Sequence, residues 1–161
     1  MSTPLVEIRQ ALMVSQAEFL ALLARFQPET LHQQIDNEPW TPAVILLHMC
    51  EAREHYTADV GRLLASDFKA RVGRATDDPQ RMTEIAAAAT GVATAEQIEG
   101  RLRDSFARMM RVLDGVQEAD LDRPVTLARP GFEDLRLAGF IGRFLVGHHQ
   151  MHVNQLTALT D

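Results

Sequence analysis

Residues 40–51 read Trp40-Thr41-Pro42-Ala43-Val44-Ile45-Leu46-Leu47-His48-Met49-Cys50-Glu51. The stretch combines a helix-start signal with an apolar run. Thr41 is a good N-cap, because its side-chain oxygen can accept a hydrogen bond from the first helical turn. Pro42 stands at the first helical position, where its missing N–H costs nothing, and Trp40 and Ile45 have the spacing of a hydrophobic staple. The stretch therefore predicts a helix that runs to about Leu64.

Three other segments carry apolar residues at spacings of three and four, the period of an amphipathic helix. One runs from about Leu5 to Phe26, and the last from about Leu135 to Leu159. Between them, the capping box Thr94-Ala95-Glu96-Gln97 opens a helix to about Leu113. The expected fold is therefore all-α: a four-helix bundle with long crossover connections, in one domain over residues 1–161.

Two longer connections separate the predicted helices. The first spans about residues 65–93, with a turn at Asp77-Asp78-Pro79 and a turn or two of helix at residues 85–89. A connection of this length inside a compact domain is usually functional or mobile, and we expect it to cover one end of the bundle. The second spans about residues 114–133, where Val125–Leu127 shows weak strand-like alternation.

Composition narrows the class of protein. The 161 residues carry a net charge of −6, and the 16 Lys and Arg residues are dispersed rather than clustered, which argues against nucleic-acid binding. The only cysteine, Cys50, excludes an internal disulfide and fits a reducing cytoplasm. The sequence has no signal-peptide pattern and no apolar stretch of the roughly 20 residues that span a bilayer. We therefore expect a cytoplasmic protein that does not enter membranes.

The last predicted helix contains Gly147-His148-His149-Gln150-Met151-His152-Val153-Asn154-Gln155-Leu156. His148 and His152 are four residues apart, so both rings leave the same face. That face also carries the apolar residues of the helix and must point inward. Such a pair can grip one metal ion, although His pairs at this spacing also occur by chance. His149 lies about 100° around the helix, facing a neighbouring helix or solvent.

His48 is embedded in the apolar run, where an unpaired polar ring is costly. It is either a hydrogen-bonded core residue or a metal ligand. His55, seven residues on, lies on roughly the same face, and His32 in a polar loop is expected to be incidental. Three imidazoles buried together without a metal would leave several nitrogens seeking partners. An inward-facing pair and another inward-facing histidine on a second helix therefore favour a metal site over a metal-free bundle.

Motifs from two helices resemble a known family. Trp40-Thr41-Pro42 is followed by His48, and the last helix reads His148-x-x-x-His152-x-x-Gln155-Leu156. The Thr-capped third helix and Leu121-Asp122-Arg123-Pro124 follow in the same order. In these features the chain resembles the DinB/YfiT-like superfamily of bacterial proteins over nearly its whole length. One departure is the adjacent histidine pair, which here begins at the first ligand position, His148, instead of ending at the second.

The resemblance implies a four-helix bundle with a three-histidine site for zinc, nickel or a similar ion. By position, the implied ligands are His48, His148 and His152. It also implies a homodimer. Better-understood relatives include thiol-dependent transferases and isomerases, which use a low-molecular-weight thiol such as mycothiol or bacillithiol.

Three protein ligands leave a coordination position open, as in catalytic zinc sites. Such an ion lowers the pKa of a bound water or thiol, so we hypothesise a metal-dependent transferase, isomerase or hydrolase that acts on a small electrophile. The alternative is a non-catalytic, metal-stabilised dimeric module for binding or stress response. Imidazole suits several metals, so the sequence does not identify the ion.

Three further side chains near the predicted ligands have alternative roles. Glu51, one turn beyond His48, is either a hydrogen-bonding partner or base for the site, or a solvated or capping carboxylate. Gln155 either hydrogen-bonds a ligand histidine or serves in packing or solvation. Cys50 points about 200° away from His48, so we expect a buried structural thiol rather than a fourth ligand.

Overall fold

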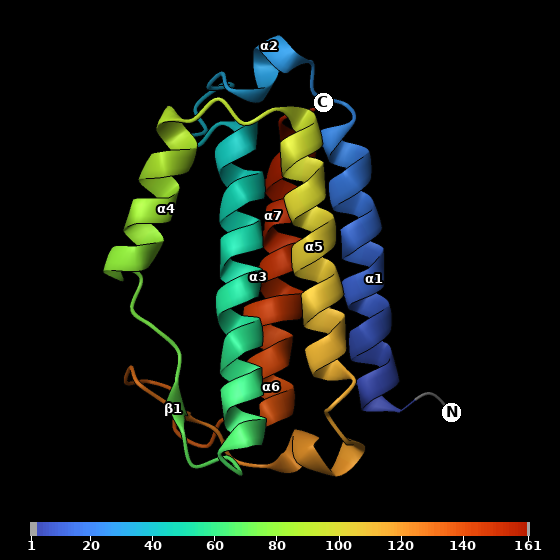
Figure 1. The fold of residues 1–161 in the computed structure, drawn as a ribbon, viewed down its shortest axis with the longest axis vertical. Helices are drawn as coiled ribbons and strands as arrows, with labels where there is room; N and C mark the ends of the chain where they lie inside the picture. Colours follow the sequence, from blue (N-terminus) through green and yellow to red (C-terminus); the bar gives the residue numbers. More distant parts are fainter. Residues whose placement is uncertain (1–2, 161) are drawn as a thin grey trace.

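Four long helical stretches run side by side along the molecule (Figure 1). The computed structural model describes residues 3–160. The bundle consists of α1 (Pro4–Leu23), α3 (Pro42–Ala65), α5 (Ala95–Leu113) and the continuous last stretch. That last stretch comprises α6 (Leu137–Ile141), a π-helical segment (Gly142–Gly147) and α7 (His148–Ala158). The predicted four-helix bundle with long crossovers is confirmed.

The helix starts follow the local signals in the sequence. The Thr41 hydroxyl accepts a hydrogen bond from the backbone N–H of Val44, with Pro42 in the first turn of α3. Thr94 and Gln97 form both hydrogen bonds of the capping box at the start of α5. These contacts satisfy backbone donors that have no partner inside the helix, which is why the starts were predictable.

The shorter elements lie in the connections. They are α2 (Pro28–Leu31), β1 (Arg71–Val72), α4 (Pro79–Thr90), a 3-10 turn (Glu118–Asp122) and β2 (Thr126–Leu127). β1 and β2 pair in parallel, with Arg71 opposite Thr126, so the two long connections are tied to each other. The weak strand signal at Val125–Leu127 corresponds to β2.

The first long connection contains more helix than predicted. The helical turn or two predicted at residues 85–89 is part of α4, which begins earlier, at Pro79, and has 12 residues. Asp78 is its N-cap and accepts a hydrogen bond from the backbone N–H of Arg81, while Pro79 occupies the first turn. The Asp-Pro pair is therefore a helix start as well as a turn. The helix lies beside α3 along the bundle, rather than across one end (Figure 1).

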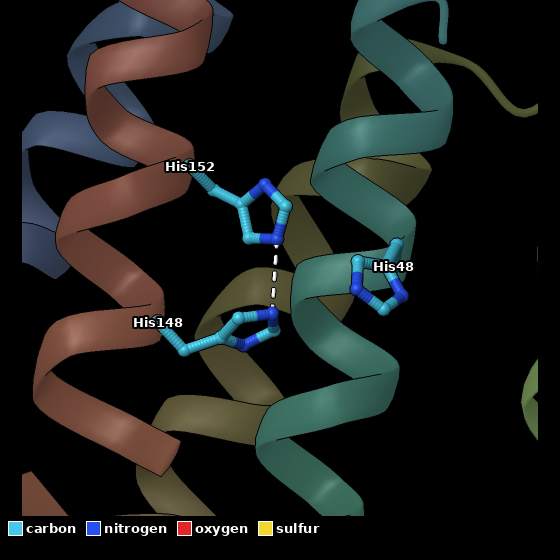
Figure 2. A group of neighbouring side chains, drawn as sticks. All are labelled: His48, His148 and His152. Carbon is cyan, nitrogen blue, oxygen red and sulfur yellow. Dashed lines mark hydrogen bonds between the residues drawn. The ribbon is translucent and has the colours of Figure 1, made fainter. Parts of the chain in front are cut away.

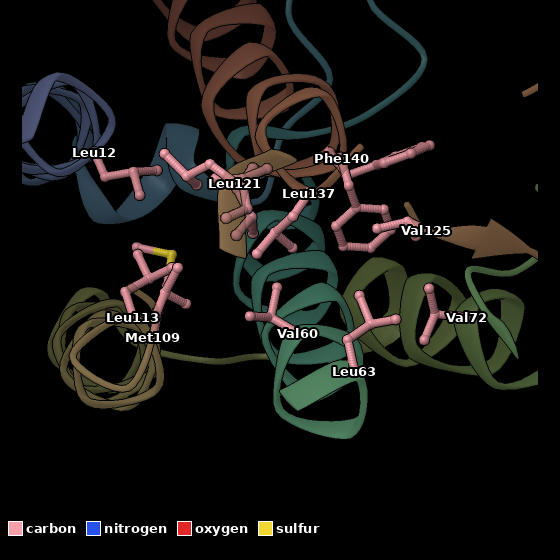
Figure 3. Packing of buried hydrophobic residues seen from close by; sticks show 14 of the residues in the cluster. Leu12, Val60, Leu63, Val72, Met109, Leu113, Leu121, Val125, Leu137 and Phe140 are labelled. Atoms are coloured by element: carbon pink, nitrogen blue, oxygen red, sulfur yellow. The ribbon is translucent and has the colours of Figure 1, made fainter. Parts of the chain in front are cut away.

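Two hydrophobic clusters fill the bundle. One contains Leu12, Val60, Met109 and Phe140, which converge from different helices (Figure 3). The other contains Phe19, Ile45 and Leu102 towards the other end. Tyr56 packs against both clusters. Along the last stretch, Leu145 belongs to the first cluster and Val153 to the second, so His148 and His152 lie where the clusters meet.

No helix within residues 3–160 is long and apolar enough to cross a membrane.

Candidate metal centre

His48, His148 and His152 come together between α3 and α7 (Figure 2). One nitrogen from each ring lies within 4.8 Å of the other two. The ring centroids of His148 and His152 are 4.5 Å apart, and His48 lies 5.4 and 5.2 Å from them. The i, i+4 spacing thus places two rings on one inward face, and the helix start at Thr41 sets the register that brings His48 opposite them.

Hydrogen bonds define the orientation of His152. Its Nδ1 lies 2.7 Å from Gln155 Oε1, which can only accept, so Nδ1 carries the proton. The lone pair is then on Nε2, which lies 3.0 Å from His148 Nε2. Two imidazole nitrogens that share one zinc ion in tetrahedral geometry lie roughly 3.3 Å apart, so the observed separation is close to that arrangement. Of the two roles considered for Gln155, the structure shows the hydrogen bond to His152.

The cluster has unsatisfied polar atoms. Nδ1 of His48 and Nδ1 of His148 are buried without a hydrogen-bond partner among the described residues. Leaving such atoms unpaired costs free energy. A donor set of neutral imidazoles with spare nitrogens fits a divalent ion such as zinc or nickel.

The environment keeps the rings uncharged. Burial, followed by His152, His148, Arg81 and Arg74, lowers the pKa of His48 to about 3. Burial, followed by His152 and the same two arginines, lowers the pKa of His148 to about 3. Burial also lowers the pKa of His152. Metal binding requires neutral imidazole, so protons do not compete for these rings at neutral pH.

Aromatic rings pack against all three histidines. The indole of Trp40 contacts His48 edge-on, with ring centroids 4.9 Å apart, and stacks near His152 at 6.3 Å. Tyr56 approaches His148 edge-on at 6.5 Å and stacks on Phe144 at 4.9 Å. These contacts restrict the orientation of the histidine rings.

Glu51 lies beside His48 and forms a buried ion pair. Its Oε2 is 3.9 Å from His48 Nδ1, beyond hydrogen-bonding distance. Arg74 donates to both carboxylate oxygens, with Nη2 to Oε2 at 2.6 Å. Glu51 is therefore not a solvated or capping carboxylate. The ion pair places it next to a histidine of the cluster and also fixes the connection after β1.

Asp59 holds the same connection at Gly73, the residue before Arg74. It is fully buried, and its Oδ2 accepts a hydrogen bond of 2.7 Å from the backbone N–H of Gly73. Gly73 has φ +85°, a conformation that glycine adopts readily. This hydrogen bond fixes the backbone at Gly73, and the next residue, Arg74, then reaches Glu51. His55 lies 3.5 Å from Asp59 Oδ2 and stands outside the three-histidine cluster.

His149 belongs to a separate buried network. It is fully buried against neighbouring helices, which decides between the two orientations considered. Arg53 Nε donates to His149 Nε2 at 3.4 Å, so Nδ1 carries the proton and donates to Ser15 Oγ at 3.3 Å. Arg53 itself is fully buried and also donates to the Leu102 carbonyl and to Ser105 Oγ. The network joins α1, α3, α5 and α7 behind the cluster.

Two other predictions concern residues away from the cluster. Cys50 is buried, and burial raises the pKa of its thiol to about 11, so it remains protonated and is not part of the cluster. His32 hydrogen-bonds the carbonyl of Ala93 at 2.7 Å, which makes it a loop contact.

The buried Arg53 and the arginines around the cluster were missed by sequence reasoning. Arg74, Arg81, Arg129 and Arg143 line one cavity beside His48 and His148. They come from separate segments of the chain, so no local pattern marks them. The first long connection supplies Arg74 and Arg81, the second supplies Arg129, and the last helical stretch supplies Arg143.

A family model of the DinB superfamily matches residues 11–156. The chain belongs to the DinB superfamily. The resemblance seen in the sequence motifs is therefore confirmed, and this DinB member contains the three-histidine cluster expected from them. No curated protein matches the sequence.

Two solved structures share this DinB fold. One is a mycothiol-dependent maleylpyruvate isomerase, with a TM-score of 0.74 and 14% identity. The other is an alanine mutant of that isomerase, with a TM-score of 0.73 and 13% identity. Each match covers 97% of this chain but only 63% of the isomerase chain. At this identity the likeness establishes the fold alone.

The lowered histidine pKa values predict how the stability of the metal-free protein depends on pH. In the unfolded chain these rings titrate near pH 6.5, whereas His48 and His148 have a pKa of about 3 in the folded chain. Between these values the unfolded chain binds more protons, so stability falls as the pH falls. We expect each of the two rings to contribute about 1–2 kcal/mol to the loss between pH 7 and pH 5.

Urea denaturation of chelator-treated protein at pH 7 and pH 5 measures this loss. The His48→Gln variant should lose less stability between the two pH values than the wild type, because one titrating ring is gone. Equal pH dependence in the two proteins would contradict the assigned pKa of His48.

Proposed function

We propose that His48, His148 and His152 bind one divalent metal ion, zinc or nickel, and that the metal-loaded protein catalyses a thiol-dependent transfer or isomerisation of a small electrophile. The observation that carries the proposal is the convergence of three neutral imidazoles on one point. The fold similarity to a mycothiol-dependent isomerase supports the choice of a thiol as co-substrate.

A divalent ion with three histidine ligands supplies a position at which a thiol or water binds with a lowered pKa. The chain provides the surroundings for this chemistry. Gln155 keeps the proton of His152 on Nδ1, so that Nε2 faces the centre. Trp40 packs against His48 and Tyr56 against His148, which restricts the orientation of these rings.

Glu51 acts as a fixed carboxylate beside His48 rather than as a proton-transfer group. Both of its oxygens already accept hydrogen bonds from Arg74. A carboxylate held in this way is poorly available as a general base, because both of its oxygens are already engaged. Metal-ligating histidines commonly direct their second nitrogen at a carboxylate, and Glu51 is the carboxylate that lies beside His48.

Elemental analysis of protein purified without a metal-affinity tag tests the metal site. We expect about one ion per chain in the wild type and almost none in His48→Ala and His152→Ala. Gln155→Leu should weaken metal affinity roughly 10- to 100-fold, because it removes the partner that orients His152. His32→Gln, outside the cluster, should keep wild-type stoichiometry. Full metal content in both alanine variants would overturn the ligand assignment.

Turnover assays separate an enzyme from a non-catalytic module. Metal-loaded protein is mixed with mycothiol, bacillithiol or glutathione and with unsaturated carbonyl or activated aryl halide electrophiles. The proposal requires product formation that needs both metal and thiol and that is lost in His48→Ala. Turnover without thiol would instead indicate a hydrolase. Metal binding without any turnover would favour the metal-stabilised binding or stress-response module.

We also propose that the protein is a homodimer. The α1 helix exposes the apolar side chains of Val6, Met13 and Val14, and Met151 is exposed on α7. Light scattering should give about twice the 18.0 kDa mass of one chain. Val14→Glu should shift the protein towards the monomer, whereas a wild-type monomer at micromolar concentration would contradict the proposal.

A further inference from the structure

A cavity of about 320 Å³ adjoins the three-histidine cluster. Its wall includes His48 and His148, together with Arg74, Arg81 and Arg129. Arg143, in the π-helical segment, completes a set of four arginines. No aspartate or glutamate within residues 3–160 belongs to the wall. The volume is at the lower end of the range for small-molecule sites, about 300–1,000 Å³.

The positive charge of this cavity is only partly balanced. Arg74 is paired with Glu51. In the described part of the chain, no carboxylate lies within ion-pair distance of Arg81, Arg129 or Arg143. Three cations around one partly enclosed space repel each other more than cations in bulk water.

Aromatic contacts hold two of these arginines without neutralising them. The guanidinium groups of Arg129 and Arg143 each lie 4.8 Å from the centroid of Phe132, and Arg129 lies 5.3 Å from that of Phe144. Contact with a ring face leaves the N–H groups at the guanidinium edge free to donate. Arg81 is held by a hydrogen bond from one Nη to the carbonyl of Thr76.

We propose that this cavity binds the anionic group of a small molecule, a carboxylate or a phosphate, through Arg81, Arg129 and Arg143. A guanidinium group can donate two parallel hydrogen bonds to two oxygens of a carboxylate or a phosphate. Because His48 and His148 form part of the same wall, a molecule anchored there has its remaining atoms beside the histidines. The substrate class is therefore an anionic electrophile. This assignment of a substrate rests on the proposed function. Anion binding itself does not require the metal.

Calorimetric titration of the zinc-loaded protein tests this proposal with three probes: succinate, inorganic phosphate and the neutral analogue succinamide. We expect saturable binding of succinate, phosphate or both, at one site per chain, and none of succinamide. Tighter succinate binding identifies a carboxylate site, and tighter phosphate binding a phosphate site. Arg129→Gln and Arg143→Gln should each weaken the preferred anion about tenfold, the loss expected for one charge-assisted contact.

Arg103→Gln is the matched control, because Arg103 is exposed on α5 and pairs with Glu99. It should bind the anion like the wild type, and thermal unfolding verifies that each variant is folded. Arg81→Gln, on α4, probes a different element and should also weaken binding. Absence of anion binding, equal binding of succinamide, or unchanged affinity in the arginine variants would overturn the proposal.

Metal analysis of the same samples separates this inference from the proposed function. One ion per chain without anion binding refutes the anion site alone. Anion binding by a protein that takes up no metal supports the anion site and refutes the metal-dependent function.

Discussion

Burial of histidine rings, nearly complete for His48 and His152 and partial for His148, is the constraint around which the bundle is organised. Each ring carries two nitrogens that need partners, and burial holds the pKa of His48 and His148 to about 3. Gln155 satisfies Nδ1 of His152, and one nitrogen of each ring lies within 4.8 Å of a nitrogen of the other two. The two hydrophobic clusters meet at this level, so the histidines lie between two packed regions of the bundle and beside the arginine-lined cavity.

A second set of buried charges connects the long connection to the cluster. Asp59 anchors Gly73, the next residue Arg74 pairs with Glu51, and Glu51 lies beside His48. A buried ion pair is costly to break, because removal of one partner leaves the other unpaired in the interior. The position of the connection is thus coupled to the environment of one histidine, and the same connection supplies two of the arginines in the neighbouring cavity.

The sequence predicted those features that depend on neighbours along the chain. Thr41 with Pro42, and Thr94 with Gln97, marked helix starts because capping is local. The spacing of His148 and His152 fixed their common face for the same reason. Asp78 and Pro79 carried an equally local signal, which was interpreted as a turn, so α4 was underestimated.

Other features were beyond sequence reasoning for a physical reason. The arginines at positions 74, 81, 129 and 143 meet only through tertiary structure, and Arg53 reaches His149 across 96 positions. The inward orientation of His48 was predictable from its apolar neighbours, but its pairing with the last helix came from family resemblance. Periodicity identifies a face of a helix, and it does not identify which other helix that face meets.

The π-helical segment directly before His148 changes which face of the last helix points inward. A π turn encloses one residue more than an α turn, so the helix beyond it is rotated relative to a regular α-helix by about 100°. A Cβ on Gly147 would lie 3.1 Å from the carbonyl oxygen of Gly142, so a small residue suits this wide turn. Phe140 before the segment, Leu145 within it and His152 beyond it can therefore all face the interior. Loss of a single residue here would leave the length of the bundle nearly intact, yet it would rotate the buried face of one half of the helix by about 100° away from its present partners.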